Sequence, residues 1–268
     1  MRSNDSFFPL ARIIAAVHML PSEGSRRPDG QPREQIINHA LLHAQIAWDG
    51  GVRALYLQNT NELPIAPRAT PETIETMIAA GSAVRKAFPD MALGVTLVEH
   101  GAAEVLDIAK AIDAQFVRIK TYIGTMVKAE GMLHGCAYEA IHHRYDIKAT
   151  DIRIFADVYD RLGEPLAPLP LNEACRQAVD FGRADALILS GKTSEQSIRM
   201  IDDVRTMRLG APLILGGGMS FSNLRFFANR ADHFLIWAGF VKRGLPAQNG
   251  VPVEWDGSLI KAFVEATK

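Results

Sequence analysis

Short apolar segments alternate with longer amphipathic segments along almost the whole chain, and this alternation constrains the fold more than any other feature. Such a pattern is typical of a parallel α/β sheet in which a helix follows each strand. We predict eight strands, at Arg12–Met19, Val52–Gln58, Ala92–Val98, Gln115–Lys120, Ile152–Val158, Ala186–Ser190, Pro212–Gly216 and His233–Trp237. Eight strand-helix pairs in 268 residues predict one (βα)₈ TIM barrel domain over residues 1–268, with residues 1–10 as an N-terminal extension.

The segments between these strands carry helix signals. Thr70 can cap a helix that begins at Pro71, and glycines fall where helices should end, at Gly50, Gly51, Gly182 and Gly210. Residues Gly163–Pro170 include three prolines and predict a loop after the fifth strand. A doubly wound open sheet is the alternative, but the segment after the first strand lacks the glycine-rich fingerprint of that fold.

The composition argues against several classes of protein. Apolar residues make up 48% of the chain and charged residues 22%, which is typical of a globular protein. The net charge is −1 and the 29 basic residues are spread along the chain, so we expect no nucleic-acid partner. No apolar run reaches about 18 residues and no signal-peptide cleavage site is recognisable, so we expect neither a membrane span nor export. Two cysteines form no disulfide framework, which favours a cytoplasmic location.

Charged residues lie at the C-terminal ends of the predicted strands, where barrel enzymes keep their catalytic groups. Period-two alternation directs Val117 and Ile119 toward the helices, and Arg118 and Lys120 toward the barrel axis. The same rule directs Asp157 inward from the following strand. We therefore predict that Lys120 and Asp157 meet as a buried pair at the tops of adjacent strands.

Three interpretations of this pair remain open. In the first, His18 and Asp157 transfer protons next to a carbonyl group while Lys120 stabilises the developing oxyanion. In the second, Lys120, Arg118 and Asp157 form an ion-pair layer that only fills the barrel. In the third, Lys120 forms a Schiff base, which ranks lowest because opposite charges nearby would keep the amine protonated.

Further polar residues at strand ends complete the predicted site. His18 ends the first strand, Asn59 follows the second and Glu99 follows the third. The predicted catalytic residues are His18, Glu99, Lys120 and Asp157, and the predicted ligand-binding residues are Asn59, Arg118, Ser190 and Gly191.

A run of three glycines follows the seventh strand and leads into a helical pattern at Asn223–Ala228. Glycines allow close approach of the backbone, and amides at the start of a helix favour an anion, as in the phosphate sites of many barrels. Residues after the eighth strand, including Lys242 and Arg243, would form the other wall. The predicted phosphate-binding residues are Gly216, Gly217, Gly218, Ser220, Gly239 and Phe240, and a plain tight turn is the alternative.

The histidines give no metal-site pattern. His39 and His43 lie four residues apart on the first predicted helix, but no acidic or cysteine ligand accompanies them, so we interpret them as helix surface. His134, His142 and His143 cluster around the fourth helix and are interpreted as exposed histidines. We expect neither a metal nor another cofactor.

Taken together, these segments resemble the BtpA/SgcQ family, which is placed among the ribulose-phosphate-binding barrels. The resemblance covers nearly the whole chain. It rests on Ile14–Pro21 with Gly24-Ser25, Asp49–Val52, Phe116–Lys120, Gly124–Val127, Glu130-Gly131, Gly135, Ala137, Glu139, Arg144, Phe155–Val158, Ala184–Ile188, Gly216–Gly218 and Asn223. The family is named for a role in photosystem I biogenesis and is often labelled, by analogy, phosphoribosylanthranilate isomerase.

The resemblance implies acid/base chemistry by fold analogy alone. In that isomerase a cysteine on strand one and an aspartate on strand five share the proton transfer, and His18 and Asp157 occupy comparable strands here. The family usually has Asn at the position of Lys120, Asn near Thr96, Asn-Asp near Glu99-His100, and a Lys-His pair where this chain has Arg161-Leu162. These departures indicate a divergent member whose substrate or catalysis has changed.

Two functions compete on this basis. The first is an enzyme that isomerises, or otherwise transfers protons on, a small phosphorylated sugar-like metabolite at the C-terminal face of the barrel. The second is a non-catalytic assembly or regulatory protein that retains the fold. A homo-oligomer is compatible with both. A sulfate or phosphate bound at Gly217–Ser220 would favour the enzyme, whereas a site filled by side chains would favour the second function.

Overall fold

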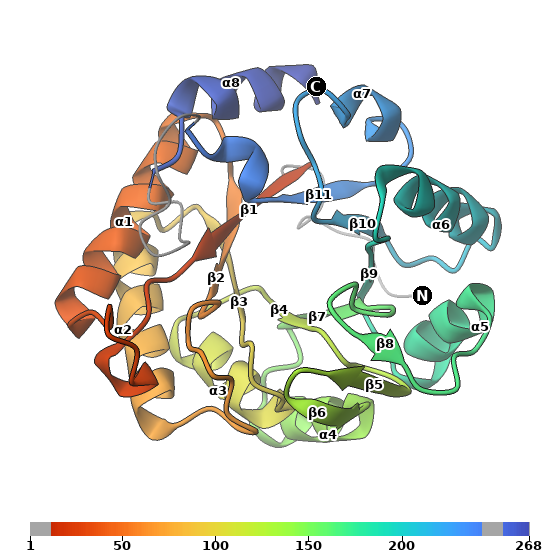
Figure 1. The fold of residues 1–268 in the computed structure, drawn as a ribbon, viewed down its shortest axis with the longest axis horizontal. Coiled ribbons are helices and arrows are strands. Elements are labelled where there is room, and N and C mark those ends of the chain that lie inside the picture. The colour runs from red at the N-terminus through yellow and green to blue at the C-terminus, as the bar shows by residue number, and fades with distance from the viewer. Residues whose placement is uncertain (1–11, 243–253, 268) are drawn as a thin grey trace.

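Eight parallel strands close into a barrel in the computed structural model, which describes residues 12–242 and 254–267 (Figure 1). The strands are β1 (Ile13–His18), β2 (Ala54–Gln58), β3 (Ala92–Thr96), β4 (Phe116–Ile119), β7 (Arg153–Asp157), β9 (Ala186–Leu189), β10 (Leu213–Gly216) and β11 (His233–Ile236). Each pairs in parallel with the next barrel strand along the chain, and β11 pairs with β1 to close the ring. The predicted TIM barrel is therefore confirmed, and each strand lies within its predicted range.

A helix follows each barrel strand, and together the helices surround the ring of strands (Figure 1). They are α1 (Arg33–Asp49), α2 (Pro71–Ala87), α3 (Ala102–Ala111), α4 (Ala137–Asp146), α5 (Leu171–Arg176), α6 (Ser194–Thr206), α7 (Leu224–Phe227) and α8 (Gly257–Ala266). Short helical turns add η1 (Glu23–Ser25), η2 (Gln177–Phe181) and η3 (Ala238–Phe240). The predicted cap is present, since the Thr70 side chain accepts a hydrogen bond from the Thr73 amide at 3.2 Å.

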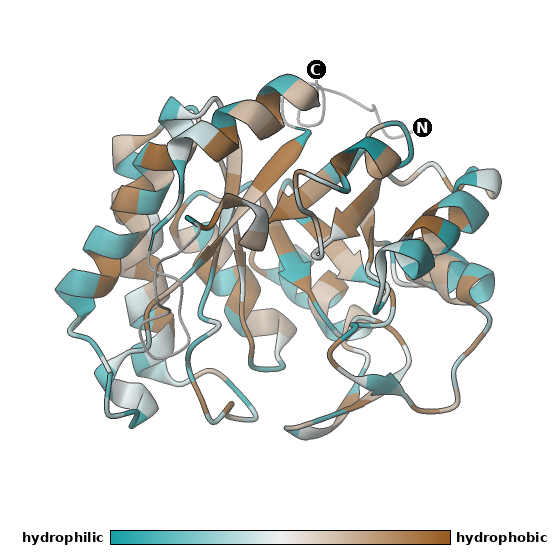
Figure 2. Ribbon diagram, turned by 45° about the horizontal axis from the view of Figure 1, so that its top comes forward, coloured by the Kyte–Doolittle hydropathy of each residue, from teal (hydrophilic) through white to brown (hydrophobic). Residues whose placement is uncertain are grey.

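Alternate residues of the strands face two separate apolar clusters. One cluster lies inside the barrel and includes Ile14, Tyr56, Phe116, Phe155 and Ile188. The other lies between the strands and the helices and contains Val117, Ile119, Ile154 and Ala156, as predicted from period-two alternation. Figure 2 shows the same arrangement, with hydrophobic strands at the centre and hydrophilic residues on the outer sides of the helices.

A second, three-stranded antiparallel sheet is formed by the segments that follow β4 and β7. It consists of β5 (Thr125–Lys128), β6 (Gly131–His134) and β8 (Glu164–Pro165), in the order β6-β5-β8. The segment Gly163–Pro170, predicted to be a loop, therefore contributes a short strand. Because β5 and β6 follow the C-terminal end of β4, this sheet lies on the same side of the barrel as the predicted site.

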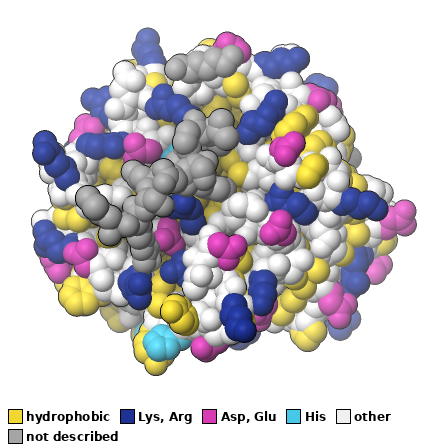
Figure 3. Space-filling model, turned by 180° about the vertical axis from the view of Figure 1, so that it is seen from behind, with side chains coloured by type: hydrophobic (Ala, Val, Ile, Leu, Met, Phe, Trp, Pro, Cys, Tyr) yellow, Lys and Arg dark blue, Asp and Glu magenta, His cyan; other side chains and the backbone are white. Residues whose placement is uncertain are grey.

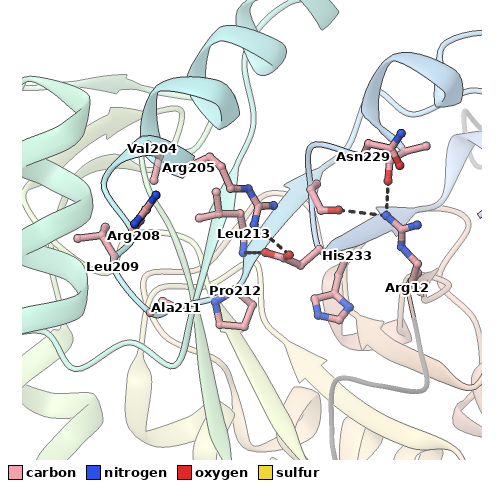
Figure 4. Close-up of a pocket in the computed structure, with 14 residues that line it drawn as sticks. Arg12, Val204, Arg205, Arg208, Leu209, Ala211, Pro212, Leu213, Asn229 and His233 are labelled. Carbon is pink, nitrogen blue, oxygen red and sulfur yellow. Dashed lines mark hydrogen bonds and ion pairs between the residues drawn. The ribbon is translucent and has the colours of Figure 1, made fainter. Parts of the chain in front are cut away.

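The opposite end of the barrel holds a separate cavity of about 830 Å³ (Figure 4). Its arginines make internal contacts: Arg12 donates to the carbonyl of Thr267 at 3.1 Å, and Arg205 pairs with Asp232 at 3.1 Å. On the face turned away from Figure 1, basic and acidic side chains are interspersed (Figure 3). The contacts that line this cavity join strand ends to the last helices and belong to the scaffold.

Two predictions fall outside the described residues, namely the N-terminal extension at 1–10 and the placement of Arg243. Among residues 12–242 and 254–267, no helix combines the length and the apolar character that crossing a bilayer requires.

Candidate functional site

A cavity of about 460 Å³ opens at the C-terminal ends of the barrel strands, a volume within the usual range for ligand sites. It brings together seven of the residues predicted to form the site: His18, Arg118, Lys120, Ser190, Gly216, Gly217 and Gly218. The other seven, Asn59, Glu99, Asp157, Gly191, Ser220, Gly239 and Phe240, do not line it. The cavity is therefore where the sequence predicts it, but only half of the predicted residues reach it.

Arg118, and not Lys120, is the partner of Asp157. Nε and Nη2 of Arg118 each donate to one carboxylate oxygen of Asp157 at 2.8 Å, and Nη1 donates to the Tyr56 hydroxyl at 3.0 Å. The carboxylate is almost fully buried, and burial raises its pKa while the Arg118 guanidinium opposes that shift. The predicted Lys120–Asp157 pair is wrong: within the described part of the chain, Lys120 makes no ion pair with any carboxylate.

The register of the strands and the shape of the guanidinium explain this result. β4 pairs with β7 so that Arg118 lies opposite Phe155, which makes Asp157 its diagonal neighbour, within reach of a long side chain. A guanidinium also meets a carboxylate through two parallel hydrogen bonds, which an ammonium cannot do. Arg118 therefore occupies both oxygens of Asp157, and the predicted ion-pair layer is formed by Tyr56, Arg118 and Asp157 without Lys120.

Lys120 is surrounded by charges that already have partners. Besides Asp157, the nearby carboxylates are Asp160, which accepts a hydrogen bond from Lys128 at 2.9 Å, and Glu99, which accepts one from Asn59 at 2.7 Å. Lys120 itself is half-buried and makes no hydrogen bond or ion pair with any described residue. Burial, followed by repulsion from the Arg118 guanidinium, lowers its pKa from 10.5 to about 8.

The turn between β5 and β6 places a carboxylate in the same cavity. Glu130 lines the cavity with a side chain that is only 7% exposed, and its Oε1 accepts no hydrogen bond. Its one charged contact is Lys128, whose Nζ lies 3.5 Å from that oxygen. A buried carboxylate oxygen without a hydrogen-bond donor is unusual, and this one belongs to a residue that lines the cavity.

His18 lines the cavity but is a poor proton acceptor. Its ring stacks on Trp237, with centroids 4.2 Å apart. Burial, and then the positive charges of Lys120 and Arg118, lower its pKa from 6.5 to about 3. The imidazole is therefore neutral around pH 7, so it can stack against or hydrogen-bond a ligand but accepts a proton only weakly.

Glu99 and Asn59 lie beside the cavity and contact each other. The Asn59 side-chain amide donates to Glu99 at 2.7 Å and accepts from the Val98 amide at 2.9 Å. Burial raises the pKa of Glu99. Glu99 borders a small void that Lys120 also lines, so Asn59 positions Glu99 and does not itself reach a ligand.

The glycine turn after β10 faces a cation that the sequence analysis did not select. Gly217 and Gly218 have φ angles of +77° and +72°, and a Cβ built on Gly217 would lie 3.4 Å from Cζ of Arg161. Arg161 comes from the loop after β7, lines the cavity and makes no hydrogen bond or ion pair with the described residues. The amides of Gly217, Gly218 and Met219 are likewise without hydrogen-bond partners in the described part of the chain.

The remaining residues predicted to bind phosphate have structural roles. The Ser220 amide donates to the Asn223 side chain at 2.8 Å, and Phe240 is fully buried against Trp255 and Phe263. Gly239 packs closely on Phe263. The helix α7 has only four residues, so the anion-binding helix start expected at Asn223–Ala228 is absent from this loop.

Ser190 and Gly191 mark the other edge of the glycine turn. The Ser190 hydroxyl donates to the carbonyl of Gly216, which holds the turn against β9. The Gly191 amide donates to the Ser197 hydroxyl at 3.0 Å, so it belongs to the start of α6 and not to the cavity.

His39 and His43 are buried, which corrects their interpretation as helix surface. His39 Nε2 contacts the His18 carbonyl at 3.0 Å, and the His43 ring meets Trp255 edge-on. His134 and His142 are both exposed, as predicted. His142 lies on α4, whereas His134 lies on the strand β6 that precedes this helix. Within the described ranges, no group of three or more potential ligands could hold a metal ion.

Fold and cavity together define a TIM-barrel protein with a cavity lined by several cationic side chains at the C-terminal ends of its strands. The chain belongs to the BtpA family, whose sequence pattern matches residues 10–268.

Relatives span most of the chain. An uncharacterized protein of Archaeoglobus fulgidus is 30% identical over 87% of this chain and 92% of its own length. The photosystem I biogenesis protein BtpA of Synechocystis is 24% identical over 95% of this chain and 87% of its own. Among solved structures, phosphoribosyl anthranilate isomerase from Thermus thermophilus superposes with a TM-score of 0.54, at 16% identity over 96% of this chain and 100% of that one.

Four charged residues of the cavity were not selected from the sequence: Lys128, Glu130, Asp160 and Arg161. Two signals could have pointed to them. Glu130 lies in the segment that resembles the family, and Arg161 stands where the family usually has a Lys-His pair. Both positions are in loops, whose spatial neighbours cannot be read from period-two alternation.

Proposed function

We propose that this protein is an enzyme that binds a small phosphorylated, sugar-like metabolite in the 460 Å³ cavity and transfers protons next to its carbonyl group, as an isomerase does. The observation that carries the proposal is the unpartnered Arg161 guanidinium beside Gly217 and Gly218, whose amides also lack partners. A guanidinium and successive backbone amides around one turn are the groups that bind a phosphate.

The chemistry that we assign to the cavity differs from the sequence-based expectation. Asp157 and Arg118 are engaged with each other, so they support the floor of the site. Lys120 and Glu130 remain for the reaction: the amine can act on the carbonyl group, and the carboxylate can carry a proton. His18 contributes a neutral ring.

The alternative is a non-catalytic assembly protein, and the name of the Synechocystis relative favours it. A cavity that keeps a half-buried amine without a partner and a buried, unsatisfied carboxylate oxygen is costly to maintain in a protein that uses only its surface. The contents of the cavity therefore favour the enzyme.

We further propose a cytoplasmic location, because both cysteines are buried as free thiols.

The test is the affinity for ribose 5-phosphate compared with ribose, measured by calorimetry and thermal shift. We expect the phosphate to bind and ribose to bind far more weakly. Arg161→Ala should weaken the phosphate complex by about tenfold to a hundredfold, since a hydrogen bond to a charged group contributes roughly 1.5–3 kcal/mol. Arg176→Ala, which removes an exposed guanidinium on α5, is the matched control and should change nothing. Equal affinity in wild type and Arg161→Ala, or no preference for the phosphate, contradicts the proposal.

A further inference from the structure

Two lysines line the cavity, and only one of them is available to react. Lys128 is held by Asp160 at 2.9 Å and lies 3.5 Å from Glu130. Lys120 has no such contact within the described residues, because Asp157 is occupied by Arg118 and Asp160 by Lys128. The arrangement thus leaves the Lys120 amine in the cavity without a hydrogen-bond acceptor among the described residues.

We propose that the Lys120 amine forms a Schiff base with the carbonyl carbon of the metabolite that the cavity binds. The inference deepens the proposed function and rests on it, since the phosphate would hold the carbonyl compound in place. Lys120 and the Arg161–Gly217 side line one continuous cavity, so a molecule anchored at the glycine turn shares that space with the amine.

The surroundings of Lys120 favour the neutral, nucleophilic amine. A lysine must be neutral to attack a carbonyl, and the neighbouring cations Arg118 and Lys128 both oppose its protonation. Of the carboxylates near the ammonium, Asp157 and Asp160 are shared with those same cations, and Glu99 is hydrogen-bonded to Asn59 and forms no ion pair with Lys120. The lowered pKa of Lys120, about 8, agrees with this geometry.

The reaction balances with groups that are present. The amine attacks the carbonyl carbon, the C–N bond forms, and one proton moves from the nitrogen to the carbonyl oxygen to give a neutral carbinolamine. The nitrogen lone pair then expels that hydroxyl, which leaves as water after accepting a second proton, and an iminium ion remains. Glu130 is the carboxylate that we assign to carry the protons, because it lines the cavity and its buried Oε1 accepts no hydrogen bond from the described residues. The iminium withdraws electrons from the adjacent carbon and so promotes the proton transfer assigned to this site.

The experiment is reductive trapping on the whole protein. Wild type is incubated with glyceraldehyde 3-phosphate or with glyceraldehyde, sodium borohydride is added, and the modified lysines are located by peptide mass spectrometry. We expect Lys120 to carry at least about tenfold more adduct than Lys128 or the exposed Lys86, because its pKa of about 8, below the ordinary value of 10.5, leaves more neutral amine at neutral pH. Lys120→Arg should remove that adduct while keeping the charge, and Lys86→Arg should leave it unchanged.

The outcomes separate this inference from the proposed function. An adduct on Lys120 that forms equally well with glyceraldehyde supports the reactive amine and counts against the phosphate site. Binding of the phosphate that depends on Arg161, without an adduct on Lys120 above the level of Lys86, overturns the inference and leaves the phosphate site standing. Because the adduct is read directly on wild type, the result does not depend on whether Lys120→Arg folds.

Discussion

Arg118 and Lys120 lie two residues apart, one in β4 and the other just after it, and both face the barrel interior, yet their surroundings differ completely. Arg118 makes three hydrogen bonds, two to Asp157 and one to Tyr56, and closes the layer beneath the cavity. Lys120 faces the cavity without a partner among the described residues. The satisfied cation supports the structure, and the unsatisfied one remains for chemistry, so hydrogen bonding separates two residues that the sequence pattern treats as equivalent.

The largest expected effect comes from breaking the layer that Tyr56, Arg118 and Asp157 form beneath the cavity. Asp157→Asn leaves the Arg118 guanidinium buried without its counter-charge, and should lower the free energy of unfolding by about 3–5 kcal/mol in urea denaturation. Adding Arg118→Met should recover much of this loss. Asp107→Asn, which breaks an exposed contact with His143, should cost less than about 1 kcal/mol. A loss below about 1 kcal/mol for Asp157→Asn would show that the layer is not a coupled, desolvated unit.

A smaller effect should follow from changing the glycine turn. Gly217→Asp forces a side chain into a left-handed conformation, which costs about 1–2 kcal/mol, and adds a negative charge beside the unpartnered amides. Gly210→Asp is the matched control, because Gly210 has a similar φ of +75° at the other end of the barrel. Both variants should lose similar stability in urea denaturation, but only Gly217→Asp should lose affinity for ribose 5-phosphate in calorimetry. Equal phosphate affinity in the two variants would remove the turn from the site.

The smallest stability effect is expected for Lys120→Met, because no described contact is broken. At pH 7 the free energy of unfolding should stay within about 0.5 kcal/mol of wild type or rise. The free energy of unfolding should depend on pH differently in wild type and in Lys120→Met, because the native-state pKa of Lys120, about 8, lies below the ordinary value of 10.5. Between these values the unfolded state binds more protons, so wild type should gain stability relative to Lys120→Met as the pH rises from 8 to 10.5. A constant difference across that window would contradict the assigned pKa.

The fold could be predicted because its signals are local. Each barrel strand is a short apolar run that must be buried on both faces, and period two assigns Val117 and Arg118 to opposite faces without knowledge of any neighbour. The small sheet was not predictable in this way. Its strand β8 contains only Glu164 and Pro165, and it exists because Met126 and Val127 lie beside it in space.

The site could be predicted in position but not in its pairings. Alternation places Arg118, Lys120 and Asp157 on one face, but it cannot decide which cation binds the carboxylate; strand register and guanidinium geometry decide that. Arg161 reaches the glycine turn from a loop on another βα unit, so no spacing in the sequence connects them. The residues that best distinguish this cavity are therefore those whose partners are set by tertiary structure.

The most direct test of this account is the titration of the Lys120 amine, followed by NMR in protein with isotope-labelled lysine and assigned by comparison with Lys120→Arg. The account predicts a midpoint near pH 8, well below the ordinary value of 10.5, because the amine is shielded from water and faces Arg118 without an ion-paired carboxylate among the described residues. A midpoint near the ordinary value of 10.5 would mean that Lys120 is a solvated or paired ammonium, and would contradict its assignment as the reactive group of the cavity.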